Sequence, residues 1–474
     1  MEKLREEVKR RLAANESPAR IRAALIEQGY AEQDINESLN EQAVSHVQER
    51  DAADKRNSRI FTLRELLDRV GYGAAAPQFI NILFYQTGAT LFLLGLFNGL
   101  RTVLSLLFTS VLQEYAKVHR VSKNFIGAAG VLFGFSFLFM AFAVRSQAVW
   151  LFAVGILLAG IGVVTYGDLY NKFVMETLRR EKMGGLLRRM GTYGVFITMA
   201  SMLLGGWLID RFPATTPEVM LLGIRVTPIG YLLSFEITAF AFIISGYMLS
   251  FVVERREERS QPLGRFIVAH YASLTQHIRG FVKDRYITLL LLATVATGLL
   301  EVLGHSYYGL FIYQQFKDQA FGGFLNVAVI AAIAIFASFS GPFFTRLLQR
   351  AIGFAPMLVF GTLLMAILPL TLVYNANIGA VGAAFACAVI GGAIVGYSQG
   401  LLARKLMDEA TRRTYFMAVG LLVSVPYLLL VPFGAWLAQA AGMTALFLVI
   451  GVGLAVVVMP LYFILVALAN KQRL

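Results

Sequence analysis

An acid and a histidine stand one helical turn apart inside a long apolar run of the chain. In TGLLEVLGHSYYGLF, residues 297–311, Glu301 precedes His305 by four positions, so a helix places both side chains on one face. If this run spans a membrane, a charge at its centre costs about 2.5–3.5 kcal/mol and is rarely retained without a role or a partner. A buried carboxyl group prefers its neutral form, and histidine titrates near physiological pH. Glu301 and His305 are therefore predicted to form a proton-coupling site, with a hydrogen-bonded structural pair as the alternative.

The same run carries a stripe of polar side chains. Thr294, Thr297, Glu301, His305 and Tyr308 recur at spacings of three and four residues, so they lie along one face of a helix. Polar side chains within a membrane helix face the interior of the protein or a water-filled cavity. We therefore expect this face to border a wet or polar surface inside the protein.

Three further charges fall within apolar runs. Arg101 and Glu236 lie at similar depth in two different runs, so a mutual ion pair is predicted, structural rather than substrate-binding. Asp168 lies near the inner end of its run and could reach water there, which leaves its role open. No cluster of acids suits a sodium ion, and Cys387 is the single cysteine. We expect protons as the coupling ion, and neither a metal nor a cofactor.

The elements that position these residues are membrane-spanning helices. Hydrophobic residues make up 57% of the chain and charged residues 15%, against roughly 45–50% and about 25% in soluble domains. Apolar runs of about 20 residues cross the hydrocarbon core as helices. The first run is interrupted by Gln78, Asn81 and Gln86. We predict an all-α membrane protein with twelve transmembrane helices in two pseudo-symmetric sets of six, at 71–90, 91–113, 125–144, 148–170, 190–209, 227–252, 286–312, 322–345, 353–374, 378–402, 414–437 and 443–468.

The distribution of Lys and Arg gives the predicted orientation. Most of these residues fall ahead of Gly71, in alternate loops and at the C-terminus, whereas the other loops hold Arg145, Arg211, Arg225 and Lys317. Cytoplasmic loops carry the excess of positive charge, so both termini are predicted to be cytoplasmic in a protein of the cytoplasmic (inner) membrane. The formal net charge of +13 is then explained by topology and by contact with the anionic lipid bilayer. No nucleic-acid partner is expected.

Residues 1–48 differ in composition from the rest of the chain. They are charged, with apolar residues at helical spacing, and Ser17 followed by Pro18 is a helix start signal. IRAALIEQGY followed by DINESLNE resembles the ubiquitin-associated type of three-helix module, which implies a protein partner; a solvated helical extension without a ligand is the alternative. The predicted domains are a cytoplasmic helical module at 1–48, a charged linker at 49–66, a six-helix bundle at 67–253, a cytoplasmic amphipathic linker at 254–284 and a second six-helix bundle at 285–470.

From about 67 to 470 the layout resembles the major facilitator superfamily, with two six-helix halves, a long basic middle loop and both termini inside. The family's loop motif is Gly-x-x-x-Asp-Arg/Lys-x-Gly-Arg-Arg. In GPFFTRLLQR, Gly341 and Arg346 match it while Thr345 stands in place of the acid. In SVLQEYAKVHR, Glu114 can take the place of the acid. The resemblance implies that Glu114, Gly341 and Arg346 belong to the gating loops.

The resemblance also implies a function and a site. Proteins of this layout are secondary active transporters that work by alternating access, so a small organic solute is the implied substrate and proton coupling the implied energy source. The glycine-rich run 190–209 is similar to the family's antiporter helix but lacks its usual proline, so export is favoured over uptake only on that partial match. Polar residues of the first, fourth, seventh and tenth helices are the implied substrate cavity: Gln78, Asn81, Tyr85, Thr165, Tyr166, Asp168, Thr297, Tyr308, Tyr397 and Gln399.

Two other classes of function compete with a transporter. A non-transporting membrane sensor or scaffold would act through its N-terminal module, and deletion of residues 1–48 distinguishes it from a transporter. An enzyme is not expected, because the chain has no nucleotide-binding loop, no HExxH and no nucleophile elbow in a suitable context. We expect a monomer.

Overall fold

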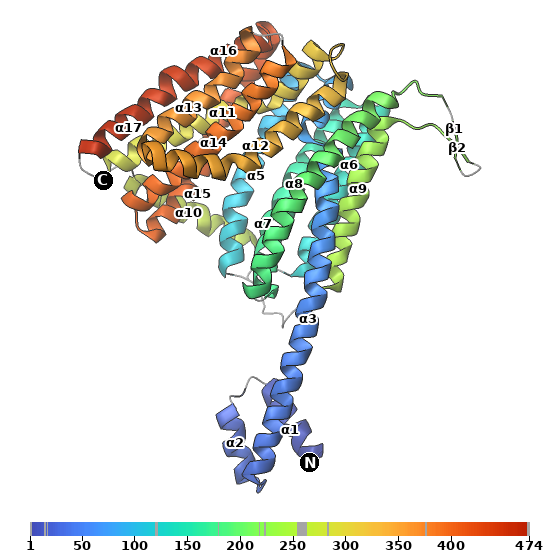
Figure 1. Cartoon of the computed structure of the whole chain (residues 1–474), viewed down its shortest axis with the longest axis vertical. Coiled ribbons are helices and arrows are strands. Elements are labelled where there is room, and N and C mark those ends of the chain that lie inside the picture. Colours follow the sequence, from blue (N-terminus) through green and yellow to red (C-terminus); the bar gives the residue numbers. More distant parts are fainter. Residues whose placement is uncertain are drawn as a thin grey trace.

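The computed structural model is helical almost throughout (Figure 1). Elements are described from the residues whose placement is defined, which are 2–13, 16, 18–118, 122–178, 180–217, 219–221, 224–253, 263–281, 284–374 and 377–471.

A small helical bundle lies at the N-terminus, apart from the rest of the molecule (Figure 1). It consists of α1 (Glu2–Ala13), α2 (Pro18–Glu27) and the first turns of α3 (Glu32–Ala74). As predicted, Pro18 begins the second helix; Ser17 lies outside the described residues. Gly29, at φ +88°, takes the left-handed conformation that ends this helix. The bundle has an apolar core of its own, formed by Leu4, Val8, Ile21, Leu25, Ile35 and Leu39 with Tyr30 packed against it.

The third helix of the bundle continues into the main body of the protein. α3 has 43 residues, so the predicted linker 49–66 is helical and joins the bundle to the other helices without a break. Asn57 fixes α3 to the chain that follows the sixth span: its Nδ2 donates to the carbonyl of Val253 at 3.1 Å, and its Oδ1 accepts the main-chain N–H of Val253 at 3.0 Å.

The predicted first span is broken. α3 ends at Ala74, and α4 (Pro77–Gln86) begins three residues later with proline at its first position. Proline lacks the N–H that continues a helix and is favoured at the start of one. Residues 71–90 are therefore not one continuous helix, because the end of α3 and the short α4 share this part of the chain.

Eleven segments within the described part of the chain are long and apolar enough to cross a membrane. They confirm the predicted class of an all-α membrane protein. The first half holds α5 (Leu91–Val118), α6 (Lys123–Arg145), α7 (Val149–Thr177), α8 (Arg180–Arg211) and α9 (Gly230–Met248), followed by the short η1 (Leu249–Phe251). The second half holds α11 (Arg285–Phe316), α12 (Gly323–Ile352), α13 (Phe354–Tyr374), α14 (Ile378–Leu406), α15 (Glu409–Ala440) and a last span made of α16 (Met443–Gly453), η2 (Leu454–Val458) and α17 (Met459–Lys471).

Two further elements lie outside the spans. Between α8 and α9, β1 (Val219–Leu221) pairs antiparallel with β2 (Ile224–Val226), with Val219 opposite Val226. Between the halves, α10 (Leu263–Phe281) packs across α5 and α15. The predicted amphipathic linker is thus a helix over part of its length.

The two halves pack against each other through several helix pairs. α5 lies along α15 and also contacts α11, α8 contacts α12, and α4 contacts α11 and α12. Figure 1 shows the helices of the second half inclined to those of the first. We call the ends of the helices nearest the N-terminal bundle the proximal face, marked by Asn57, Glu114 and Arg413, and the opposite ends the distal face, marked by Asp210 and Tyr313.

Candidate functional site

A cavity of about 630 Å³ lies between the two halves. The first half contributes α4 and α5, and the second half contributes α11, α12, α13, α14 and the last span. One side of the cavity is polar and the other is largely apolar. Its polar lining residues are Gln78, Asn81, Asn98, Arg101, Thr102, Glu301, His305, Ser306, Tyr308 and Ser338.

The break between α3 and α4 positions the polar residues of the first span. α4 packs closely on α11, where Gly309 leaves room for Gln78: a Cβ at Gly309 would lie 2.9 Å from the Cβ of Gln78. Asn81 is buried and its Nδ2 donates to the carbonyl of Ser306 at 3.1 Å. A cross-half hydrogen bond therefore fixes α4 against the helix that carries Glu301 and His305.

Glu301 and His305 both line the cavity. Nε2 of His305 lies 3.9 Å from Oε1 of Glu301. The side chain of Glu301 is 46% exposed and that of His305 is 63% exposed. The sequence argument assumed that the protein buries Glu301, and the structure corrects this: the pair faces an open cavity. A proton acceptor in this position is accessible to water and to a solute.

Arg101 lies on α5 in the same cavity, one turn from Asn98. Gly160 of α7 makes room for its stem, because a Cβ at Gly160 would lie 2.5 Å from the Arg101 Cγ. The predicted ion pair between Arg101 and Glu236 is wrong. Glu236 is exposed on α9, and α9 packs on α3, α6 and α8 while α5 packs on α7 and α15. Similar depth in the sequence did not place the two side chains on facing helices.

Of the ten residues predicted for the substrate cavity, Gln78, Asn81 and Tyr308 line it. Thr297 and Gln399 lie deeper in the second half, where both contact the hydroxyl of Tyr462.

The remaining predicted residues lie elsewhere. The hydroxyl of Tyr397 donates to Gln349 Oε1 at 3.1 Å, Thr165 donates to the carbonyl of Ile161 within its own helix, and Tyr85 is half-buried at the distal end of α4. The side chain of Asp168 lies outside those that the structure describes.

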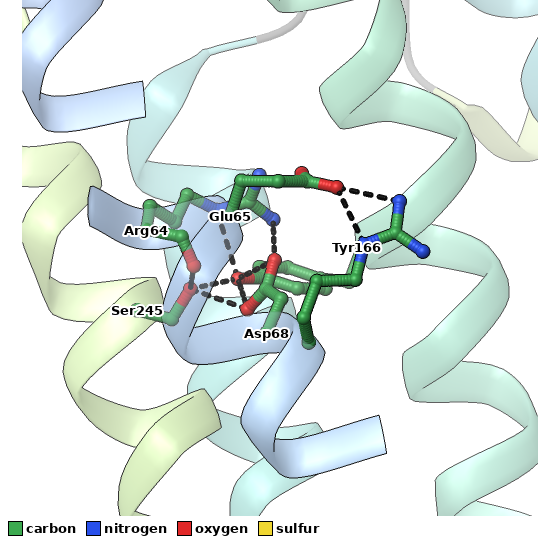
Figure 2. Close-up of polar contacts among 6 residues, drawn as sticks. Arg64, Glu65, Asp68, Tyr166 and Ser245 are labelled. Atoms are coloured by element: carbon green, nitrogen blue, oxygen red, sulfur yellow. Dashed lines mark hydrogen bonds and ion pairs between the residues drawn. The ribbon is translucent and has the colours of Figure 1, made fainter. Parts of the chain in front are cut away.

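Tyr166 lies in a different site, a buried cluster within the first half (Figure 2). Its hydroxyl accepts Nε–H of Arg64 at 2.8 Å and lies 2.9 Å from Oδ1 of Asp68. Ser245 donates to the same carboxylate, and Arg64 Nη2 lies 3.1 Å from Asp68 Oδ2. The prediction that Tyr166 lines the cavity is therefore wrong. The cluster ties α3, α7 and α9 together.

Sequence reasoning missed Arg64 and Asp68 because it placed Arg64 in a linker and began the first span at Gly71. A signal was present. Phe61, Arg64 and Asp68 recur at spacings of three and four residues, and all three are buried. A buried face in this stretch extends the first span back toward the N-terminus.

Polar contacts between the halves occur at both faces. At the distal face, Asp210 of α8 accepts the main-chain N–H of Phe324 and Leu325 at the start of α12, and Gln86 Nε2 donates to the hydroxyl of Tyr313 at 2.9 Å.

At the proximal face, Glu114 of α5 forms an ion pair with Arg413 of α15. Glu114 thus contacts the opposite half. Gly341 is buried against Ala393, and Arg346 is exposed on α12.

The family model of the Major Facilitator Superfamily matches residues 65–425. The search of curated proteins gives no match.

Several solved structures are similar in fold. A bacterial homologue of the iron transporter ferroportin in its inward-facing state has a TM-score of 0.65 and 16% identity, covering 87% of this chain and 99% of that chain. The nucleoside transporter NupG has a TM-score of 0.63 and 11% identity, covering 86% and 98%. The peptide transporter PepTSo of the POT family has a TM-score of 0.62 and 12% identity, covering 88% and 99%. At these identities the likeness shows the fold alone.

The match of the family model over most of the chain, the multi-pass helical architecture and the paired halves around a cavity agree with one another. The protein is an integral multi-pass membrane protein with the fold of a secondary transporter, and it belongs to the Major Facilitator Superfamily.

Proposed function

We propose that the protein is a proton-coupled secondary active transporter that moves a small organic solute across the cytoplasmic membrane by alternating access. The observation that carries the proposal is the position of Glu301 and His305 at the wall of the cavity between the halves. Nε2 of His305 lies at ion-pair distance, 3.9 Å, from the carboxylate of Glu301, so protonation of either group changes the charge that the solute meets in the cavity. Proton and solute binding are thereby linked at one place.

The contacts at the two faces support an alternating mechanism. Glu114 and Arg413 join the halves at the proximal face, and Asp210 joins them to the start of α12 at the distal face. A transporter that exposes its cavity to each side in turn must break one set while keeping the other. We assign the proximal face to the cytoplasm, because Lys and Arg are concentrated there.

Proton flux in proteoliposomes tests the proposal. Purified protein is reconstituted with a pH-sensitive dye inside the vesicles and screened against a panel of metabolites and drugs. For solutes that the wild type transports with protons, the Glu301→Gln variant is expected to lose proton-driven accumulation. Exchange of the solute without a pH gradient is expected to persist in this variant. His305→Gln is expected to shift the pH profile of transport.

Glu236→Gln is the matched control, because it makes the same substitution at an acid that is exposed on α9 and does not line the cavity. Undiminished, equally pH-dependent transport in Glu301→Gln would contradict the coupling role of this residue.

A regulatory role is proposed for the N-terminal bundle, and here the alternative of a sensor is tested as well. The bundle has its own core and joins the transporter through the uninterrupted α3, so a protein partner bound to it would act directly on the first half. Deletion of residues 1–48 is expected to leave solute flux intact and to remove its regulation. Wild-type protein that supports a cellular phenotype without any measurable flux would favour a non-transporting sensor.

A further inference from the structure

Arg101 is a cation in the cavity that forms no ion pair with any described residue. It lines the cavity from α5. Glu301 is the single acid among the residues that line the same cavity in the described part of the chain, and its ion-pair partner is His305. Beside Arg101 lie the amide of Asn98 and the hydroxyl of Thr102, which carry no charge.

A guanidinium group cannot escape this situation by losing its proton. Arginine stays charged at any physiological pH, and an unpaired charge at membrane depth is retained only where it faces water or finds a partner. The stem of Arg101 fits over Gly160 of α7, so the packing of the first half accommodates this large side chain. The planar guanidinium offers paired donors that match carboxylate or phosphate oxygens.

We propose that the substrate is an organic anion whose carboxylate or phosphate group binds to Arg101. This inference rests on the proposed function, because it takes the cavity to be the substrate site. It adds the chemical class of the solute and separates two roles. Arg101 holds the anionic group, and Glu301 with His305 carries the proton.

The other side chains of the cavity wall indicate the chemical character of the rest of the anion. The second half contributes Tyr308, Phe385, Met365 and Leu368 to the wall, and the ring of Tyr308 packs edge-on against Phe385 at 5.7 Å. An apolar or aromatic body fits against these side chains. A cavity of about 630 Å³ holds a small molecule of this kind.

On the opposite side, the amide side chains of Gln78, Asn81 and Asn98 belong to the wall of the cavity. Their carbonyl oxygens are buried and receive no hydrogen bond from any described residue, so they offer no contact to a solute without a rearrangement of the wall. The solute class is therefore an anion with an apolar body.

The charges in the cavity couple anion binding to proton binding. With Glu301 ionised, Arg101 and Glu301 compensate each other across the cavity. When Glu301 takes up a proton, Arg101 remains as an uncompensated positive charge and attracts an anion more strongly. Proton and anion therefore bind cooperatively to the protein.

Ligand-induced thermal stabilisation of the purified full-length protein tests the proposal without requiring transport. The panel consists of aromatic and branched-chain carboxylates, the corresponding phosphate monoesters, and neutral amides and amines with the same apolar bodies. We expect anionic members to stabilise the wild type and their neutral and cationic counterparts to have no effect. The carboxylate and phosphate arms distinguish the two kinds of anionic group.

Substitutions of Arg101 supply the second arm of the test. Arg101→Gln is expected to weaken binding of the anion at least about 30-fold, as removal of one partner of a buried charge pair does. Arg101→Lys keeps the charge but not the paired donors and is expected to retain part of the affinity. Arg145→Gln, at an exposed arginine at the end of α6, is the matched control and is expected to bind as the wild type does. Thermal unfolding without ligand verifies that each variant is folded. If Arg101→Gln does not fold, the wild type is compared with Arg101→Lys instead.

Stabilisation by neutral or cationic members that Arg101→Gln leaves unchanged would overturn the proposal, and so would the absence of stabilisation by every anion in the panel. The outcome is separable from that of the coupling proposal. Anion binding that depends on Arg101, together with proton flux unchanged in Glu301→Gln, supports the solute class while it contradicts the coupling site.

Discussion

The carboxylate of Asp210 accepts the main-chain N–H of Leu325 at 2.7 Å, across the boundary between the two halves. Its other oxygen accepts the N–H of Phe324 at 2.9 Å. Both N–H groups belong to the first turn of α12, where a helix has no acceptors of its own and carries a partial positive charge. One acid of the first half therefore caps a helix of the second half and joins the two at the distal face.

Removal of this acid is expected to open the distal face. Asp210→Ala leaves two N–H groups without their acceptor, and capping and helix-dipole interactions of this kind contribute about 1–2 kcal/mol. We expect a shift of roughly 5- to 30-fold toward states with a separated distal face. Distances between spin labels at Arg145→Cys and Lys317→Cys, in a Cys387→Ser background, measure the shift. Asp318→Ala removes a neighbouring exposed acid as the control, and an equal shift in both variants would contradict the capping role.

The ion pair between Glu114 and Arg413 is expected to have a smaller effect at the proximal face. The side chain of Arg413 is 42% exposed and that of Glu114 is 21% exposed, and exposed ion pairs contribute about 0–1 kcal/mol. Glu114→Gln is expected to increase the population of states with a separated proximal face by no more than about fivefold. Spin labels at Asn124→Cys and Arg404→Cys report this distance.

Exchange of the two charges is the control for this prediction. Combining Glu114→Arg with Arg413→Glu is expected to restore the wild-type distances. High salt is expected to weaken both the shift caused by Glu114→Gln and its reversal by the exchanged charges. A shift larger than that of Asp210→Ala would show that the proximal pair controls the conformational equilibrium.

Loss of Asp68 is expected to destabilise the first half strongly. The side chains of Arg64 and Asp68 are 1% and 6% exposed, so Asp68→Asn leaves a buried guanidinium without its counter-ion. Breaking a buried pair in this way costs about 3–5 kcal/mol, whereas replacing both partners with apolar residues is often nearly neutral. Thermal unfolding is expected to show a large loss for Asp68→Asn and a recovery in Arg64→Met combined with Asp68→Leu. Glu65→Gln, at a more exposed pair on the same helix, serves as the control.

The docking of α10 is expected to weaken in acid. His270 is buried on this helix and its Nε2 has no hydrogen-bond partner among the described residues. Burial lowers the pKa of His270 below its usual 6.5, against a smaller opposing effect of Glu114 on α5. A histidine whose pKa is lowered by folding is neutral in the docked helix, so its docking free energy is fully present above pH 6.5 and falls as the pH drops from 6.5 through the lowered value.

Hydrogen exchange of α10 between pH 7.5 and 5.5, corrected for intrinsic rates, measures this effect. The rings of Phe266 and Tyr271 on α10 itself contact His270, and Glu114 of α5 acts on it electrostatically. The hydroxyl of Tyr271 donates to the carbonyl of Leu107 and holds the helix on α5 at either pH. His270→Gln is expected to remove the pH dependence, and exchange in this variant that still accelerates in acid would assign the effect to another group.

The sequence predicted the fold well because lipid imposes a strong constraint on helix length and composition. The later spans were found close to their observed ends, as for 378–402 and α14 at Ile378–Leu406. The first span was misjudged for a physical reason. Its proximal part is polar in composition but buried by the protein, with Arg64 and Asp68 paired inside the first half, so hydropathy alone placed it outside the membrane.

The candidate site was predictable only in part, since a sequence gives the face of a helix but not its neighbour. Glu301 and His305 reach the cavity as their shared face indicated. Tyr166 turns away from the cavity because Arg64 and Asp68 offer it partners inside the first half. The error with Arg101 and Glu236 has the same origin, because their helices pack on different partners.

The continuity of α3 makes the N-terminal bundle a lever arm on the first half. Leu39 in the core of the bundle and Arg64 in the buried cluster are separated by about 38 Å of continuous helix at 1.5 Å per residue. A rotation of about 15°, typical of domains that switch, would swing the bundle through roughly 10 Å. A partner bound to the bundle would therefore move with it whenever the first half rotates. A bound partner that is also fixed to another structure would oppose that rotation.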